Sequence, residues 1–216
     1  MNRGAIFDMD GTLIDTEKLY QEGWLSVAHT FGLKPSLDLA HSVSGTSGEQ
    51  MYAVVRRFYP DVDIAEYVRR VISYVDDKTS KEIRLMTGVK DILQFFKDQG
   101  VKMAVASASP KDIIKRNLTN AGIIDYFDTL VSGEEVNNGK PAPDIFLCAS
   151  KRIDIAAKEC YVFEDSLNGI KAAVAAKCTA IMIPDTVQPD ELTKKTAAAI
   201  YPSLAEALAA VRDGRI

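Results

Sequence analysis

The apolar residues recur at two different spacings along the chain, and the change of spacing predicts two kinds of structure. A short apolar run at residues 5–7 is typical of a buried strand. From residue 16 to about residue 83 the apolar residues lie three or four positions apart, as on one face of a helix, and no strand is indicated. We expect helices at residues 16–31 and 47–59 and another from residue 63, which together form a small helical bundle.

The rest of the chain alternates between apolar runs and helical segments. Four further buried strands are predicted at residues 101–106, 129–131, 161–163 and 180–183. An alternation of strands and helices is typical of a parallel sheet with helices on both faces. The pattern therefore predicts an α/β fold in which a helical block is inserted after the first strand.

Capping residues mark several helix starts. Thr87 is expected to cap the helix that ends at Gly100, and Pro110 is expected at the first position of the following helix. Two capping boxes are predicted elsewhere, at Ser47 with Gln50 and at Ser203 with Glu206.

Composition and charge exclude several classes of protein. The formal net charge is −4, which disfavours a nucleic acid as partner. No apolar run approaches the length of about 18 residues that spans a membrane, and the N-terminus lacks the apolar stretch of a signal peptide. Cys148, Cys160 and Cys178 are widely spaced and form no CxxC pair. We therefore expect a cytoplasmic protein without membrane partners, with a monomer as the default state.

The chain has few histidines. His29 and His41 both fall in polar helical stretches, and neither has a partner at metal-ligand spacing. We therefore expect ordinary surface or half-buried histidines and no zinc site, and we expect carboxylates to perform any acid–base chemistry.

Polar side chains that could take part in catalysis or ligand binding lie just beyond the predicted strands or in the loops between them. They are Asp8, Asp10, Ser107, Lys140, Glu164 and Asp165. The carboxyl ends of parallel strands form the ligand-binding edge of such a sheet, so the end of the first strand, Ser107 and Asp165 are expected to converge there. Asp8, Asp10 and Asp165 at close range would repel one another unless a divalent cation lies among them, and oxygen ligands suit Mg²⁺. With the Lys140 ammonium and the Ser107 hydroxyl, the set predicts a receptor for a phosphoryl group.

Four segments that carry these residues resemble, in family order, the four motifs of the haloacid dehalogenase (HAD) superfamily. They are residues 7–13 (FDMDGTL), 106–109 (ASAS), 139–144 (GKPAPD) and 163–166 (FEDS). The resemblance covers nearly the whole chain. It implies a Rossmann-like core made of residues 1–15 and 84–216, with a helical cap domain at residues 16–83.

The resemblance also implies roles for the motif residues. Asp8 is expected to be the nucleophile that attacks phosphorus and forms an aspartyl-phosphate. Asp10 is expected to protonate the leaving oxygen and then to deprotonate the water that hydrolyses the intermediate. Ser107 and Lys140 are expected to bind the oxygens of the transferred phosphoryl group. Asp10 also argues against a dehalogenase, because dehalogenases of this group generally lack the second aspartate and the metal.

The implied cofactor is Mg²⁺. Its expected ligands are the Asp8 carboxylate, the main-chain carbonyl of Asp10 and the Asp165 carboxylate, with Glu164 nearby. The implied partner is a small phosphorylated metabolite, and the implied reaction is hydrolysis of a phosphomonoester, with a sugar phosphate as the expected substrate. Four residues are expected to bind this substrate: Thr16, Tyr20, Thr46 and Ser109.

Two other functions remain open from the sequence. A phosphomutase similar to β-phosphoglucomutase needs a second cationic group for a bisphosphate intermediate. Here Tyr20 stands in the place of a cap histidine, and residues 45–48 contain no arginine, so hydrolysis is favoured. A phosphorylated switch protein also combines an acceptor aspartate, acidic metal ligands and a lysine, but Asp10 favours turnover over storage of the phosphoryl group.

Overall fold

The computed structural model describes residues 4–44, 46, 48–80 and 83–216, and it contains a six-stranded parallel sheet. The strand order is β3-β2-β1-β4-β5-β6, and every neighbouring pair is parallel. The strands are β1 (Gly4–Phe7), β2 (Lys102–Ser107), β3 (Thr129–Ser132), β4 (Cys160–Glu164), β5 (Thr179–Met182) and β6 (Ala199–Ile200). This confirms the predicted α/β fold.

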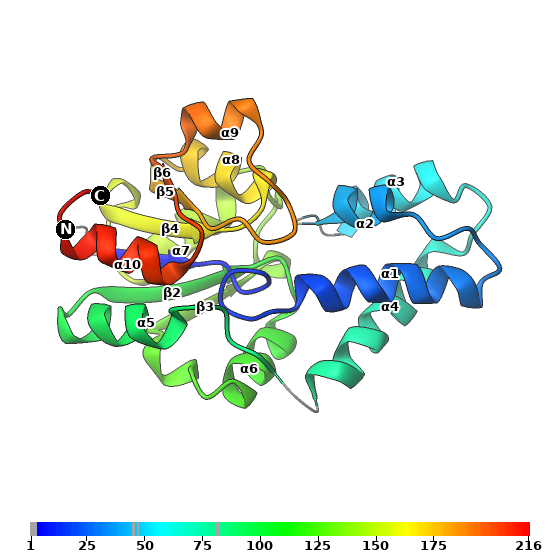
Figure 1. The fold of residues 1–216 in the computed structure, drawn as a ribbon, viewed down its shortest axis with the longest axis horizontal. Coiled ribbons are helices and arrows are strands. Elements are labelled where there is room, and N and C mark those ends of the chain that lie inside the picture. Colours follow the sequence, from blue (N-terminus) through cyan, green and yellow to red (C-terminus); the bar gives the residue numbers. More distant parts are fainter. Residues whose placement is uncertain (1–3, 45, 47, 81–82) are drawn as a thin grey trace.

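Helices cover both faces of this sheet (Figure 1). The apolar sides of α5 (Val89–Asp98), α6 (Lys111–Asn120) and α10 (Leu204–Arg212) share one buried cluster with strand residues such as Phe7. Helices α7 (Asp144–Arg152) and α8 (Leu167–Ala175) share the cluster on the opposite face. The strands read as continuous apolar runs because both of their faces are buried. Helix α9 (Glu191–Thr196) and the short 3₁₀ turns η1 (Ile124–Tyr126), η2 (Gly133–Glu135) and η3 (Ala157–Glu159) complete this part.

Four helices lie beyond the edge at which β1 ends, while the C-terminus lies at the opposite end of the sheet (Figure 1). They are α1 (Glu17–Thr30), α2 (Leu37–Val43), α3 (Gly48–Phe58) and α4 (Ile64–Thr79). Their apolar residues form a third buried cluster, separate from the two clusters of the sheet. Tyr67 lies in this cluster, where its hydroxyl donates to the main-chain carbonyl of Trp24 at 2.8 Å. Since these helices bury their apolar faces against one another, the block has a core of its own.

Several details of the predicted elements were wrong. Helix α5 is capped by Gly88 with φ 87° rather than by Thr87. Pro110 has extended geometry with ψ 149°. It is therefore the N-cap residue of α6 and not its first helical residue, and the helix begins at Lys111. The sequence pattern missed α2 and β6, because seven and two residues are too short to establish a period. Ser203 caps α10, accepting from the amide of Ala205 at 3.1 Å, but Glu206 accepts from the Ser203 hydroxyl and does not complete the predicted capping box.

The capping box predicted at Ser47 lies outside the described residues. Within the described part of the chain, no helix has the length and apolar character needed to cross a membrane.

Candidate active site

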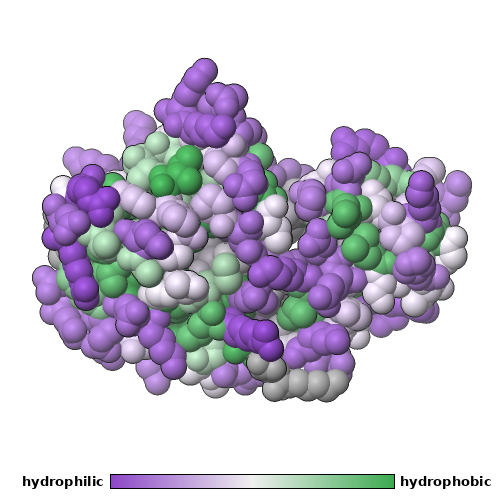
Figure 2. Space-filling view, viewed as in Figure 1, coloured by the Kyte–Doolittle hydropathy of each residue, from purple (hydrophilic) through white to green (hydrophobic). Residues whose placement is uncertain are grey.

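The ends of three adjacent strands bring the predicted residues together. In the register of the sheet, Phe7 of β1 lies between Val105 of β2 and Phe163 of β4. The residues that follow these positions therefore share one edge. A cavity lies between this edge and the four-helix block, and it is lined by Asp8, Asp10, Ser107, Lys140, Glu164 and Asp165 together with residues of α1–α4. The surface is hollowed between the sheet and this block (Figure 2).

The Lys140 ammonium lies between two buried carboxylates. Its Nζ donates to Asp8 Oδ1 at 2.5 Å and to Glu164 Oε2 at 2.6 Å. The Lys140 side chain is 3% exposed, which would be costly for an unpaired charge. Burial lowers the pKa of Lys140, but Asp8 and Glu164 outweigh this effect and raise it above its ordinary value. Lys140 is therefore a fixed cation beside Asp8.

Both oxygens of the Glu164 carboxylate accept hydrogen bonds from this chain. Oε1 accepts from the Ser166 amide at 3.0 Å and from the Ser166 hydroxyl at 2.7 Å, and Oε2 accepts from Lys140. Gly169 lies against the carboxyl group so closely that a Cβ there would overlap it. These contacts make Glu164 the group that orients Lys140 toward Asp8.

Three hydroxyl groups hold the Asp10 carboxylate. Oδ1 accepts from Thr16 at 2.6 Å, and Oδ2 accepts from Ser109 at 2.9 Å and from Ser107 at 3.3 Å. Burial raises the pKa of Asp10, and these hydrogen bonds oppose the rise. A carboxyl group with a raised pKa can carry a proton closer to neutral pH than a free aspartate can.

The acidic residues at the sheet edge fit a divalent cation. Carboxylate oxygens of Asp8, Glu164 and Asp165 lie within 4.8 Å of one another. Asp165 Oδ2 is buried and has no hydrogen-bond partner in the part of the chain that the structure describes. It lies next to Gly11, where φ is +78° and a Cβ would reach the Asp165 carboxylate. Burial and Glu164 raise the pKa values of Asp8 and Asp165 well above the ordinary value. An all-oxygen donor set with an unpaired buried carboxylate is suited to a hard cation such as Mg²⁺.

Known proteins resemble this chain in sequence and in fold. The family model described as haloacid dehalogenase-like hydrolase matches residues 5–183. The chain is 33% identical to the phosphorylated carbohydrates phosphatase of Thermotoga maritima, over 80% of both chains. The chain therefore belongs to the haloacid dehalogenase-like hydrolase family. This confirms the resemblance inferred from the four motifs.

Other HAD relatives agree in sequence and fold. Hexitol phosphatase B of Escherichia coli is 32% identical, over 83% of this chain and 82% of the relative. The solved structure of CbbY from Rhodobacter sphaeroides in complex with phosphate is 25% identical and has a TM-score of 0.81, covering 95% of this chain and 96% of that one. The predicted enzyme class, a HAD phosphoric monoester hydrolase, is confirmed.

Three of the four residues that were expected to bind substrate line the cavity, and one does not. Tyr20, Thr46 and Ser109 line the cavity. Thr16 does not line it, because its hydroxyl donates to Asp10 and its side chain is buried behind that carboxylate. Trp24 belongs to the buried cluster of the four helices and also lines the cavity. Burial and Asp10 raise the pKa of Tyr20, so its phenol stays protonated.

Sequence reasoning missed other lining residues of this HAD site, namely Glu17, Gln21, His41, Ser44 and Thr186. On α1 a signal was present, because residues 17, 20, 21 and 24 lie on one helical face and Tyr20 was already a candidate. His41 contacts Gln21 at 3.3 Å through Nε2, a contact between α2 and α1 that sequence spacing does not reveal.

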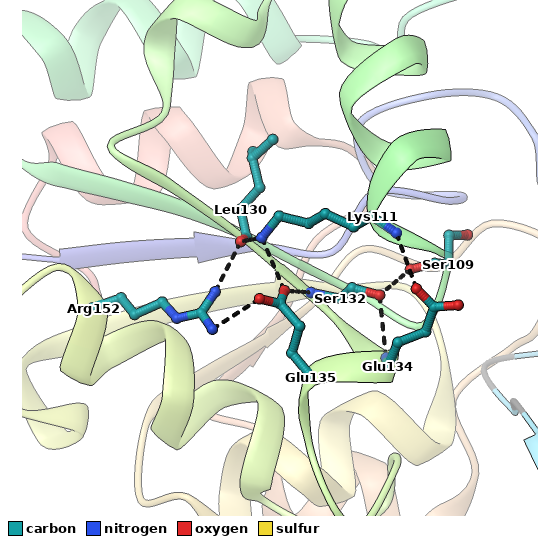
Figure 3. A network of polar contacts seen from close by, with 7 residues as sticks. All are labelled: Ser109, Lys111, Leu130, Ser132, Glu134, Glu135 and Arg152. Atoms are coloured by element: carbon teal, nitrogen blue, oxygen red, sulfur yellow. Dashed lines mark hydrogen bonds and ion pairs between the residues drawn. The ribbon is translucent and has the colours of Figure 1, made fainter.

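A polar network fixes the main chain of Ser109 (Figure 3). Ser132 donates through Oγ to the Ser109 carbonyl at 2.7 Å, and its own amide donates to Glu135 at 2.8 Å. Glu135 also binds Lys111 and Arg152, each at 2.9 Å. The network ties β3, α6 and α7 together, and it therefore holds the Ser109 hydroxyl at Asp10.

Gly169→Ala is expected to destabilise the protein by about 1–3 kcal/mol, because the added methyl group overlaps the Glu164 carboxyl group. Displacement of Glu164 also moves Lys140 away from Asp8, so the rate of phosphate release is expected to fall. Thermal unfolding and an activity assay with a phosphomonoester measure the two effects.

Gly23→Ala in α1 is the matched control for this substitution. The nearest atoms to its new Cβ are side-chain carbons of Tyr74 and Val71 at 3.2 and 3.3 Å, which can shift slightly. Wild-type stability and activity in Gly169→Ala would contradict the role assigned to the close contact between Gly169 and Glu164.

Proposed function

We propose that this protein is a Mg²⁺-dependent phosphatase that hydrolyses a small phosphomonoester through an aspartyl-phosphate on Asp8. One arrangement carries the proposal. The Lys140 ammonium lies between Asp8 and Glu164, and the neighbouring Asp165 has a buried oxygen without a hydrogen-bond partner among the described residues. Asp10, two residues after Asp8, is hydrogen-bonded to Thr16. This arrangement supplies a nucleophile, a cation, a metal site and a proton carrier within one cavity.

In the proposed reaction, an oxygen of the Asp8 carboxylate attacks phosphorus, and the bond between phosphorus and the ester oxygen breaks. Asp10 gives its proton to the leaving oxygen, which departs as an alcohol. A water molecule then attacks the phosphorus of the aspartyl-phosphate and gives a proton to Asp10. This attack releases inorganic phosphate and restores the Asp8 carboxylate. The raised pKa of Asp10 supports its role as the group that carries the proton.

The other motif residues stabilise the transferred group. Lys140 and Ser107 are proposed to bind phosphoryl oxygens, since both line the cavity next to Asp8. The Asp8 and Asp165 carboxylates and the Asp10 carbonyl would hold Mg²⁺, with Glu164 beside them. The cation would offset negative charge on the carboxylates and on the phosphoryl oxygens.

The substrate is proposed to be a sugar or polyol phosphate. Four residues with hydroxyl or amide groups line the cavity, namely Tyr20, Gln21, Thr46 and Ser109, and Trp24 adds an aromatic residue. The two curated relatives are named as phosphatases of phosphorylated carbohydrates and of hexitol phosphate, which supports this substrate class.

We further propose that residues 1–15 and 84–216 form the catalytic core and that residues 16–83 form a cap domain over it. Their separate buried clusters support this division. A cytoplasmic monomer is part of the proposal, and the free state of Cys148, Cys160 and Cys178 is compatible with a reducing compartment.

A panel of phosphate esters tests the proposed function. The purified protein is incubated with Mg²⁺ and with hexitol phosphates, fructose 1-phosphate, nucleoside monophosphates or phosphoglycolate, and inorganic phosphate is measured. We expect release from the sugar and polyol phosphates. No release from any ester would refute the proposal.

Two further measurements separate the alternatives. Conversion of β-glucose 1-phosphate to glucose 6-phosphate without net phosphate release would indicate a phosphomutase. An aspartyl-phosphate that lasts for minutes would indicate a switch protein. We expect neither result, because Asp10 is the proposed proton carrier and because residues 45–48 contain no arginine for a second phosphate.

A further inference from the structure

Glu17 lies in the cavity but has no part in the proposed reaction. It is the first residue of α1, directly after Thr16, and its carboxyl group accepts a hydrogen bond from the Ser44 hydroxyl at 3.0 Å. Ser44 follows α2, so two segments of the four-helix block position this carboxyl group. Its Cγ lies against Gly11, which fixes the side chain near the acidic residues of the site.

The described lining of the cavity carries more acidic than basic side chains. Its acidic lining residues are Asp8, Asp10, Glu17, Glu164 and Asp165. Among the lining residues that the structure describes, Lys140 is the only lysine or arginine, and its ammonium already contacts Asp8 and Glu164. His41 is the remaining nitrogen base, and it contacts Gln21. The described lining therefore offers no ammonium or guanidinium group for a second anion on the substrate.

We propose that Glu17 determines specificity: its carboxyl group binds a hydroxyl of an uncharged polyol group and disfavours esters that carry a second anionic group. The inference rests on the proposed phosphatase function and narrows its substrate class. A second phosphate or a carboxylate on the substrate would lie near the Glu17 carboxyl group without a cationic partner. Such a placement leaves a desolvated charge unpaired and adds repulsion from like charges.

Glu17 disfavours a second anion most strongly when its carboxyl group is ionised. An ionised carboxylate accepts hydrogen bonds from hydroxyl groups and repels an anion. A protonated carboxyl group still exchanges hydrogen bonds with hydroxyl groups, and it provides no positive charge. In both states the site favours a neutral group, and Ser44 keeps the carboxyl group in place.

Matched pairs of esters test this inference. Glycerol 3-phosphate and 3-phosphoglycerate differ by a hydroxymethyl group in place of a carboxylate, and fructose 1-phosphate and fructose 1,6-bisphosphate differ by one phosphate. The ratio of kcat/KM for the neutral member to that for the anionic member is measured with Mg²⁺ at pH 8, where histidine side chains are in general uncharged. We expect a ratio of at least about tenfold for the wild-type protein.

Glu17→Gln keeps the shape of the side chain and removes its acidity. We expect it to lower the ratio by at least about fivefold, because a carboxamide no longer repels an anion and can donate hydrogen bonds to it. Ser44→Ala leaves the charge but removes the hydrogen bond to Glu17, so a smaller decrease is expected. Glu22→Gln is the matched control, since Glu22 lies on the same helix outside the cavity lining and contacts Tyr74 at 3.4 Å. It is expected to keep the wild-type ratio.

The possible outcomes are distinct. A wild-type ratio in an active Glu17→Gln protein would overturn the inference and leave the phosphatase proposal standing. An equal loss of kcat/KM on both members of each pair would also overturn it, because a purely structural role does not change the ratio. No phosphate release from any ester by the wild-type protein would refute the phosphatase proposal and, with it, the inference.

Discussion

Asp8→Asn is expected to lower the rate of phosphate release by at least about 10⁴-fold. Asp8 follows β1, and its carboxylate accepts a hydrogen bond from the Lys140 ammonium at 2.5 Å. An asparagine side chain has nearly the same shape but cannot form the proposed aspartyl-phosphate. The measurement is the steady-state release of phosphate from the best ester of the panel, with saturating Mg²⁺.

The same variant is expected to stay folded. Burial and Glu164 raise the pKa of Asp8, so its ionised form costs stability at neutral pH, and asparagine removes that cost. The thermal midpoint is therefore expected to equal or exceed the wild-type value. Asp61→Asn is the matched control, because Asp61 is exposed in the loop between α3 and α4. Substantial activity in Asp8→Asn, with a normal control, would refute Asp8 as nucleophile.

The position of the site could be predicted because it depends on sheet topology. Apolar runs located five of the six strands, and parallel strands place their carboxyl ends at one edge. Asp8, Ser107 and Asp165 each follow or end one of three neighbouring strands, so their convergence follows from the strand order. Lys140 lies in a loop. It was expected at this edge as a cation for phosphoryl oxygens, but its place between Asp8 and Glu164 was not predicted.

The remaining contacts depend on how the elements pack. The hydrogen bond between Ser44 and Glu17 joins residues 27 positions apart, and neither belongs to a motif. Thr16 was expected to face the substrate, but helical periodicity gave no direction for a residue that precedes its helix. Gly169 is another example, because its close contact with Glu164 depends on the angle at which α8 leaves β4. Pairwise contacts of this kind have no period that a sequence pattern could reveal.

Removal of divalent cations with EDTA is expected to reduce phosphate release to the background rate, and added Mg²⁺ is expected to restore it. Without a cation, the buried Asp165 oxygen has no hydrogen-bond partner among the described residues, and Asp8 and Glu164 lie close to it. A hundredfold excess of Mg²⁺ over its Kd is expected to stabilise the folded protein by about 2.7 kcal/mol. For a chain of 216 residues this corresponds to a rise in the thermal midpoint of about 5–10 °C.

The pH dependence of this rise provides a second measurement. The pKa values of Asp8 and Asp165 are raised in the folded protein, so without Mg²⁺ the folded state binds protons more tightly than the unfolded state. Stability without Mg²⁺ therefore decreases as the pH rises above the ordinary aspartate pKa of about 4. Mg²⁺ binds the deprotonated carboxylates, so its stabilising effect is expected to be larger at pH 7.5 than at pH 5.

Asp165→Asn removes one ligand and is expected to abolish most of the Mg²⁺-induced rise in the thermal midpoint at both pH values. Full activity in EDTA, or an equal rise in the thermal midpoint of Asp165→Asn, would exclude this metal site, because the two readouts depend on the same carboxylate.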